Sequence, residues 1–151
     1  MRIVDTPIEE RFERITRLMR RVIATPMAAI AIIEKDRQWF KSFQGADLAE
    51  TPRDQSFCSH TIETSDPLIV EDVTKDERFR GLSIVIDEPH IRAYAGVPLT
   101  ITDGIRIGTL CVFDTKPRLF SKDDIGFLKD LADVASGEMK SRILRDMFAA
   151  G

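Results

Sequence analysis

The apolar run L-C-V-F at positions 110–113 departs from the alternation expected of a strand with one face in water. The run belongs to residues 90–114, whose pattern predicts a long β-hairpin turning at Asp103-Gly104, a dipeptide that readily supplies positive φ angles. Apolar residues at consecutive positions indicate a strand that is covered on both faces. We therefore expect a cavity or an interface on the second face of this strand.

Apolar positions three and four residues apart predict one helix at each end of the chain. The first is expected over residues 7–24, with Thr6 as N-cap, Pro7 at the first helical position and Glu9 closing a capping box. The second is expected over residues 121–147, where Ser121 and Asp124 predict another capping box. The first helix has one narrow apolar seam, made of Ile8, Phe12, Ile15, Met19 and Val22.

Three further strands are predicted between the first helix and the hairpin. Residues 27–33 are apolar throughout, and residues 38–44 and 67–70 follow as shorter strand patterns. Residues 45–54 indicate a polar loop and residues 56–64 a short helix, whereas residues 74–89 form a long connection whose apolar residues favour packing over disorder. This order of elements predicts a single α+β domain over residues 1–151, with an antiparallel sheet of about five or six strands.

Composition narrows the functional classes. The net charge of -3 gives no positive field for nucleic acid, and the 43% hydrophobic and 31% charged residues are ordinary for a globular protein. No apolar run approaches the roughly 20 residues of a membrane span. The start of the sequence has no secretory apolar region, so we expect a cytoplasmic protein whose Cys58 and Cys111 are reduced.

Alternation along the first strand of the hairpin separates polar from small apolar residues. One face is expected to carry His90, Arg92, Tyr94 and Gly96, and the other Ile91, Ala93, Ala95 and Val97. A two-residue turn would place Tyr94 opposite Phe113, Gly96 opposite Cys111 and Pro98 opposite Thr109. A loop longer by one residue would reverse the assignment for the second strand. The polar face is the candidate pocket, and the small apolar face suits packing against helices.

Five motifs together resemble the GAF domain, a small-molecule-sensing module of bacterial signalling proteins. They are P-R-D-Q-S-F-C at 52–58, P-L-I-V-E-D at 67–72, D-E-R-F at 76–79, H-I-R-A-Y-A-G-V-P-L at 90–99 and G-T-L-C-V-F-D at 108–114. The resemblance runs from about residue 8 to residue 147, and is strongest to GAF domains attached to histidine kinases and diguanylate cyclases. It implies a ligand on the sheet face opposite the terminal helices, under residues 74–89.

The resemblance implies a non-catalytic sensory domain with an unidentified small-molecule ligand. The ligand-binding candidates are Phe57, Asp72, Arg78, Phe79, His90, Arg92, Tyr94 and Cys111. Arg78 and Arg92 are candidates for binding an anion, because a guanidinium grips a carboxylate or phosphate with two bonds. The alternative is a structural salt bridge to Asp72, Asp76 or Glu88. Tyr94 fits a ligand contact and a buried core aromatic equally well.

The two cysteines allow three interpretations. Cys58 could serve a thiol-dependent redox enzyme, or Cys58, His60, His90 and Cys111 could bind zinc if the fold brought all four together. The third is a buried free cysteine. The resemblance identifies no cofactor: residues 74–89 contain no cysteine for bilin attachment, and a chain without asparagine lacks the intact cyclic-nucleotide signature. The cysteines also differ from the pattern of the GAF enzymes that reduce methionine sulfoxide.

The terminal helices raise the question of partners. Their length and narrow seam favour a homodimer through a helical bundle, whereas the alternative is that each helix packs only on its own sheet. The chain could also belong to a longer protein in which the last helix leads to an output domain. A pure dimerisation scaffold would differ from a sensor in having its pocket filled by Phe79, Ile84 and Ile86.

Overall fold

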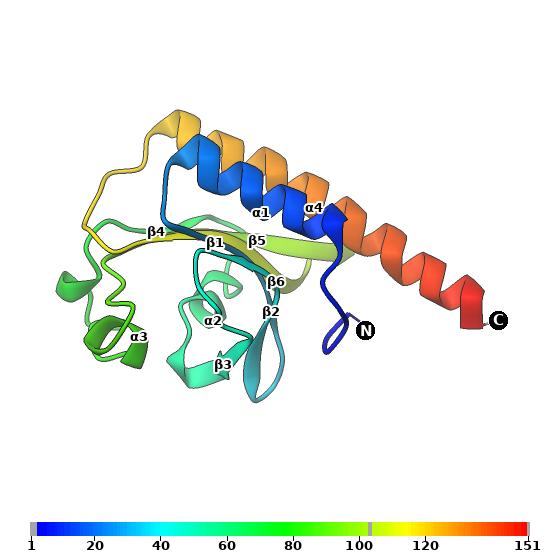
Figure 1. Cartoon of the computed structure of the whole chain (residues 1–151), viewed down its shortest axis with the longest axis horizontal. Helices are drawn as coiled ribbons and strands as arrows, with labels where there is room; N and C mark the ends of the chain where they lie inside the picture. Colours follow the sequence, from blue (N-terminus) through cyan, green and yellow to red (C-terminus); the bar gives the residue numbers. More distant parts are fainter. Residues whose placement is uncertain (1–2, 103, 151) are drawn as a thin grey trace.

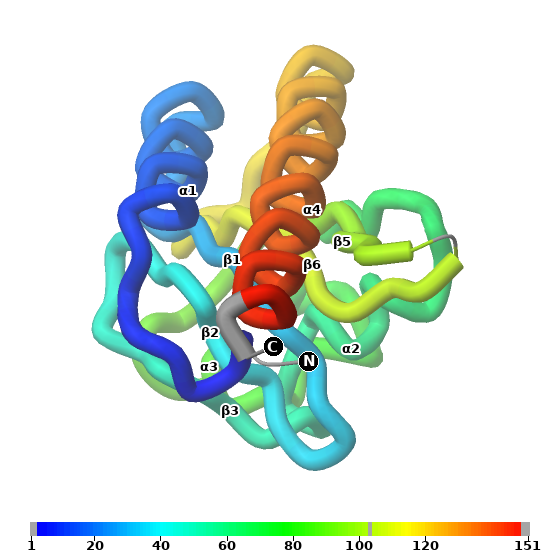
Figure 2. The backbone as a smooth tube through the Cα atoms, turned by 90° about the vertical axis from the view of Figure 1, so that its right-hand side faces the viewer, coloured from blue at the N-terminus to red at the C-terminus, as the bar shows by residue number. Residues whose placement is uncertain are grey.

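A computed structural model describes residues 3–102 and 104–150. Six strands in the described chain form one antiparallel sheet in the order β3-β2-β1-β6-β5-β4. Two long helices, α1 and α4, lie side by side on one face, and the shorter elements cover the other (Figures 1 and 2). The elements are α1 (Glu10–Ile23), β1 (Met27–Ile33), β2 (Arg37–Gln44), β3 (Glu50–Pro52), η1 (Arg53–Gln55), α2 (Cys58–Thr61), β4 (Leu68–Val70), η2 (Val73–Lys75), α3 (Ser83–Ile86), β5 (Ala93–Thr102), β6 (Ile105–Asp114) and α4 (Lys122–Ala150).

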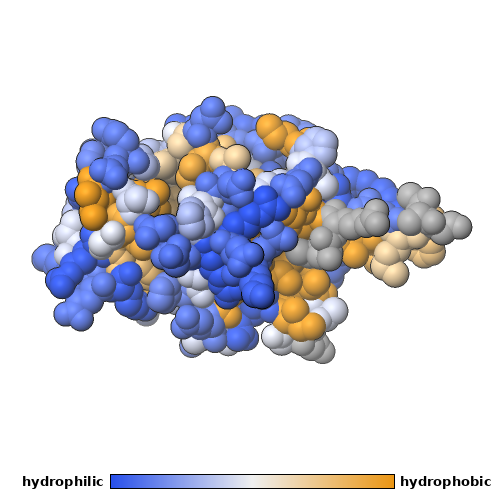
Figure 3. Space-filling view, turned by 90° about the horizontal axis from the view of Figure 1, so that it is seen from below, coloured by the Kyte–Doolittle hydropathy of each residue, from blue (hydrophilic) through white to orange (hydrophobic). Residues whose placement is uncertain are grey.

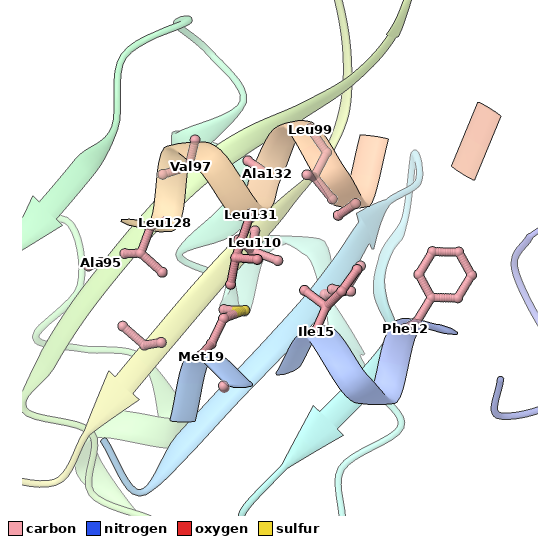
Figure 4. Close-up of a cluster of buried hydrophobic side chains, with 14 of the residues drawn as sticks. Phe12, Ile15, Met19, Ala95, Val97, Leu99, Leu110, Leu128, Leu131 and Ala132 are labelled. Carbon is pink, nitrogen blue, oxygen red and sulfur yellow. The ribbon is translucent and has the colours of Figure 1, made fainter. Parts of the chain in front are cut away.

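The main core lies between the two long helices and the sheet (Figure 4). Alanines on β5 let α4 approach the sheet closely, and larger side chains of both helices fill the remaining space. The residues labelled in the close-up come from α1 (Phe12, Ile15, Met19), from α4 (Leu128, Leu131, Ala132) and from the strands (Ala95, Val97, Leu99, Leu110). No helix among the described residues is long and apolar enough to cross a membrane.

A second core occupies the opposite face of the sheet. It contains Cys111 and Phe113 of β6, whereas Leu110 and Val112 of the same strand belong to the first core. The apolar run at 110–113 is therefore covered on both faces, which confirms the prediction from its missing alternation. The second core also includes Phe40, Phe57, Phe79 and Tyr94, drawn from β2, from the segment before α2, from the connection before β5 and from β5 itself.

The predicted hairpin pairs are present, although the register shifts on either side of Thr100 and the two shifts cancel each other. Tyr94 pairs with Phe113, Gly96 with Cys111, Pro98 with Thr109 and Thr102 with Ile105. Of the turn dipeptide, Gly104 has a φ of 75°, while Asp103 lies outside the described residues. The capping box of the last helix is also confirmed, because the Asp124 amide donates to Ser121 Oγ (3.0 Å) and the Ser121 amide donates to Asp124 Oδ2 (3.1 Å). That helix extends to Ala150, beyond the predicted residue 147.

The start of the first helix was predicted wrongly. α1 begins at Glu10, and its N-cap, Glu9, makes no side-chain capping bond. Thr6 instead donates its hydroxyl to the carbonyl of Ile3 and accepts a hydrogen bond from Lys41 Nζ (2.8 Å). Ile8 is 79% exposed and Val22 is 51% exposed, so both ends of the predicted apolar seam lie in water, and Ile23 is buried in place of Val22. The segment before Glu10 is irregular because its polar groups bond to the sheet rather than to a helix.

Two other segments differ from their predictions. Residues 50–52, expected within a polar loop, form β3 by pairing with β2 (Arg37 with Pro52, Gln38 with Thr51). β5 begins at Ala93, so His90, Ile91 and Arg92 precede the strand, and His90 has a φ of 58°. A positive φ breaks the side-to-side alternation of an extended chain. Ile91 consequently packs in the second core rather than against the helices.

A buried charge network ties β2 to both long helices. Lys41, whose side chain is 0% exposed, lies 2.6 Å from Glu9 Oε2 and donates to Pro7 O at 2.6 Å. The same carboxylate accepts from Arg142 Nε of α4 at 2.6 Å. Burial alone would raise the pKa of Glu9, but the hydrogen bonds from Lys41 and Arg142 outweigh it and lower that pKa. Burial lowers the pKa of Lys41 despite its bond to Glu9.

Candidate functional site

An apolar cavity of about 280 Å³ lies on the sheet face opposite α1 and α4. Its floor comes from β1, β2 and β6, and its walls from β3, the segment before it, Phe57, α3 and the residues that follow α3. The lining residues are Met27, Gln38, Phe40, Phe43, Ala46, Asp47, Leu48, Thr51, Phe57, Ile84, Glu88, Pro89, Ile91 and Phe113. The surface on this side is mainly hydrophilic, but apolar residues reach it at the end that carries α3 and in a second area right of centre (Figure 3).

Four phenylalanines give the cavity an aromatic lining. Phe40 and Phe43 meet edge to face at 4.8 Å between ring centroids, and Phe43 stacks on Phe113 at 5.9 Å. Phe57 meets Phe113 edge to face at 6.1 Å. Phe40 and Phe43 point to the same side of β2 because the register shifts between them, leaving Lys41 without a partner on β1. The bulge thus aims both rings into the cavity.

Gln38 is the most buried polar group of the lining, at 2% exposure. Its Nε2 donates to Thr51 Oγ1 on β3 at 3.0 Å. Its Oε1 is buried and has no hydrogen-bond partner among the described residues. Asp47 and Glu88 are exposed at the rim, and no lysine or arginine contributes to the described lining.

The structure places the eight predicted site residues in two groups. Phe57 lines the cavity, and Phe79, Tyr94 and Cys111 are buried behind the lining in the same apolar core. Phe57 stacks on Tyr94 at 4.8 Å and meets Phe79 at 4.6 Å. Asp72, Arg78, His90 and Arg92 contribute nothing to the lining. The cavity therefore lies nearer β2 and β3 than sequence reasoning placed it.

The two predicted anion-binding arginines have structural partners. Arg78 forms an ion pair with Asp76 (2.7 Å) and lies over the ring of Phe79, and its hydrogen bonds lower the pKa of Asp76. Arg92 Nη1 donates to the carbonyls of Val85 and Ile91, both at 2.9 Å, and so holds the end of α3 against the chain leading into β5. The salt-bridge alternative thus describes Arg78, whereas Arg92 bonds to carbonyl groups.

Asp72 and His90, the other two polar candidates, also contact residues two positions away in the sequence. Asp72 Oδ1 accepts from the amide and hydroxyl of Thr74 (3.0 and 2.6 Å), and the hydroxyl bond is the main cause of its lowered pKa. The ring of His90 lies 3.5 Å from Glu88. Both residues therefore stabilise turns of the connection before β5.

Cys58 and Cys111 meet in the buried core, with their sulfur atoms 3.9 Å apart. Thr109 donates its hydroxyl to Cys58 Sγ (2.8 Å), and the Tyr94 hydroxyl lies 3.4 Å from the same sulfur and 2.8 Å from Thr61 Oγ1. Burial raises the pKa of Cys111 and Tyr94 well above their ordinary values. Both thiols are free and completely buried.

The zinc hypothesis required two histidines to join this pair. Among the described residues, no three or more cysteine, histidine, aspartate or glutamate side chains are placed to hold a metal ion. His60 instead meets the ring of Phe79 edge to face at 5.1 Å. The arrangement that remains is a pair of buried thiols within a hydrogen-bonded core.

Comparison with known proteins gives a consistent picture. The family model of the GAF domain matches residues 7–139. A cyclic di-GMP phosphodiesterase of Pseudomonas aeruginosa is 38% identical over 131 residues, which are 86% of this chain and 22% of that protein. This chain thus spans about a fifth of the length of that relative.

Solved structures share the fold at low sequence identity. A domain of a two-component sensor histidine kinase protein from Sinorhizobium meliloti superposes with a TM-score of 0.72 at 21% identity, covering 97% of this chain and 98% of that one. The GAF domain of a phosphoenolpyruvate-protein phosphotransferase from Coxiella burnetii gives 0.78 at 12% identity, covering 95% and 89%. A type II free methionine-R-sulfoxide reductase from Thermoplasma acidophilum gives 0.71 at 18% identity, covering 85% and 89%.

Proposed function

This chain belongs to the GAF family, and on that premise we propose that it is a non-catalytic sensory domain that binds a small molecule in its apolar cavity. The observation that carries the proposal is the cavity itself, which lies on the sheet face opposite the terminal helices. A volume of about 280 Å³ with a few polar groups is near the lower end of the range for small-molecule sites. The signal is a change in the packing of α1 and α4 when the cavity is filled.

Strand β2 is the proposed link between cavity and helices. Its Gln38, Phe40 and Phe43 line the cavity. On its other side, Trp39 packs in the core under the helices and Lys41 bonds to Glu9. A displacement of this strand by a bound molecule therefore acts directly on the network that holds the start of α1 to α4. Coupling of this kind requires the ligand to favour one helix arrangement over another.

The complete burial of both thiols disfavours the alternative of a thiol-dependent redox enzyme. A reactive cysteine needs an accessible thiolate, whereas Cys58 and Cys111 are both 0% exposed. The scaffold hypothesis, with a filled pocket, fits less well. Phe79 is buried beside the cavity and Ile84 lines its wall, but Ile86 is 61% exposed, and the cavity stays open.

The protein is proposed to act as a homodimer within a longer signalling chain. The length of the Pseudomonas aeruginosa relative leaves room for output domains, and that relative is named as a phosphodiesterase of cyclic di-GMP. Exposed apolar side chains on the terminal helices offer a contact surface for a second copy: Leu18, Val22, Val134, Leu144, Met147 and Phe148. Leu18 and Val22 lie one turn apart on α1, as do Leu144 and Phe148 on α4, so these exposed residues are not isolated along their helices.

Native mass spectrometry of freshly purified protein tests the proposal, because it reports subunit number and any retained small molecule together. The variant Ile84→Trp fills the cavity from its wall, and Ile86→Trp on the same short helix, outside the lining, is its matched control. We expect a retained molecule, or a compound that raises the melting temperature, with the wild type and Ile86→Trp only. A bound ligand at 100 times its Kd stabilises by about 2.7 kcal/mol.

The proposal fails if no retained molecule is found and no small compound raises the melting temperature of the wild type. It also fails if Ile84→Trp binds as the wild type does, because the ligand would then lie elsewhere. A monomeric mass at micromolar concentration would overturn the dimer alone.

A further inference from the structure

We propose that the cavity selects a neutral aromatic molecule carrying one N–H or O–H donor, and that Gln38 recognises this donor through Oε1. This inference rests on the proposed function and names the chemical class of its ligand. It follows from three properties of the lining: one unpaired acceptor, an aromatic wall, and carboxylates without any basic partner.

Gln38 Oε1 is the unpaired acceptor of the lining. The Gln38 amide is fixed in place because its Nε2 is bonded to Thr51 Oγ1 (3.0 Å) and the two residues pair across β2 and β3. Its Oε1 has no hydrogen-bond partner among the described residues, although Gln38 is only 2% exposed. Buried carbonyl oxygens are rarely left unpaired in native proteins, because they lose their bonds to water without replacement. A donor on a bound molecule would complete this amide.

The aromatic wall sets the shape of the ligand. Phe40, Phe43, Phe113 and Phe57 line the space as a chain of neighbouring rings, whose consecutive centroids lie 4.8–6.1 Å apart. Rings at these spacings pack favourably against a further ring, stacked or edge on. An apolar cavity of about 150 Å³ is known to hold benzene, so about 280 Å³ admits one or two fused rings with a short substituent.

Charge excludes the anionic ligands that the sequence favoured. The described lining contains Asp47 and Glu88 but no lysine or arginine. The guanidinium groups of Arg78 and Arg92 are bonded to Asp76 and to two carbonyls, outside the lining. A carboxylate or phosphate would therefore enter an apolar space without a counter-charge, at a large desolvation cost. Asp47 and Glu88 are exposed, so water solvates their carboxylates and a cationic ligand is not needed to neutralise them.

The test compares two bicyclic probes of the same shape in calorimetric titrations of the wild-type protein. Indole has one N–H donor, and benzofuran replaces it with an oxygen that can only accept. Because a probe without a donor leaves Gln38 Oε1 unpaired, we expect indole to bind about ten- to a hundred-fold more tightly. The volume-conserving variant Gln38→Met removes the acceptor, and should bring the two affinities within about threefold of each other while benzofuran still binds.

Equal affinity of the wild type for the two probes, or a preference for benzofuran, would overturn the inference without any variant. A preference for indole that persists in Gln38→Met would overturn the role of Gln38. Tighter binding of benzoate than of indole would overturn the charge argument. If native mass spectrometry detects a retained ligand of another class, the inference fails and the proposed function stands. If neither probe nor any retained molecule binds, both fail.

Discussion

The substitution Glu9→Gln would remove the carboxylate that neutralises Lys41. Lys41 is fully buried and keeps two further bonds, to Thr6 Oγ1 and to Pro7 O. Removing one partner of a buried ion pair typically costs about 3–5 kcal/mol, because the other charge is left uncompensated. The remaining bonds place the expected cost near 3 kcal/mol. For a domain of this size that corresponds to a fall in melting temperature of about 6–12 °C.

Urea denaturation followed by far-ultraviolet circular dichroism measures this loss. The matched control is Glu10→Gln, which removes an exposed carboxylate paired with Arg17, and is expected to cost less than about 1 kcal/mol. The double variant Glu9→Gln/Lys41→Met should recover most of the lost stability, since it leaves no unpaired buried charge. A cost for Glu9→Gln below about 1 kcal/mol, or a double variant no more stable than Glu9→Gln, would show that the Glu9 carboxylate does not compensate a buried charge on Lys41.

Three further predictions concern acid stability, packing and thiol access. The pKa of Glu9 is lowered in the folded protein, so its carboxylate contributes fully to the free energy of unfolding above the unfolded pKa of about 4.3, and this contribution disappears as the pH falls through the folded pKa. The stability difference between the wild type and Glu9→Gln should therefore shrink in acid. A difference that stays constant with pH would contradict this prediction. In Gly96→Ala the added Cβ would lie 2.6 Å from Cζ of Tyr94, and urea denaturation should show a loss of about 1–3 kcal/mol; an unchanged midpoint would show that the ring moves freely. Cys58 and Cys111 should resist a thiol reagent such as DTNB in the native protein and react when it is unfolded, and rapid native labelling would disprove their burial.

The sequence predicts the hairpin well because its signals are local. Asp-Gly is typical of a tight turn, and a two-residue turn predicts the pairing of Tyr94 with Phe113. That pairing is present because two register shifts, on either side of Thr100, cancel each other. The capping box of Ser121 and Asp124 is equally local. The start of α1 differs because Thr6, Pro7 and Glu9 bond to Lys41, a residue more than 30 positions away. No local pattern reveals such a partner.

The cavity was harder to predict for two geometric reasons. Strict alternation along β2 would place Phe40 and Phe43 on opposite faces, and only the bulge at Lys41 brings both into the cavity. The prediction that strand alternation begins at His90 was wrong, because His90 has a positive φ and lies before the start of β5. No sequence signal distinguished Gln38, because polar residues are at least as frequent as apolar ones in β2, whose sequence is R-Q-W-F-K-S-F-Q.

Amide hydrogen exchange tests the coupling between cavity and terminal helices most directly. The cavity-filling variant Ile84→Trp serves as an occupied state that needs no known ligand, and Ile86→Trp is the control outside the lining. We expect that Ile84→Trp slows exchange in β2 and in the first turn of α1, near Glu9, and that Ile86→Trp leaves both unchanged. Slowed exchange confined to the residues around Ile84, with β2 and α1 unaffected, would contradict it.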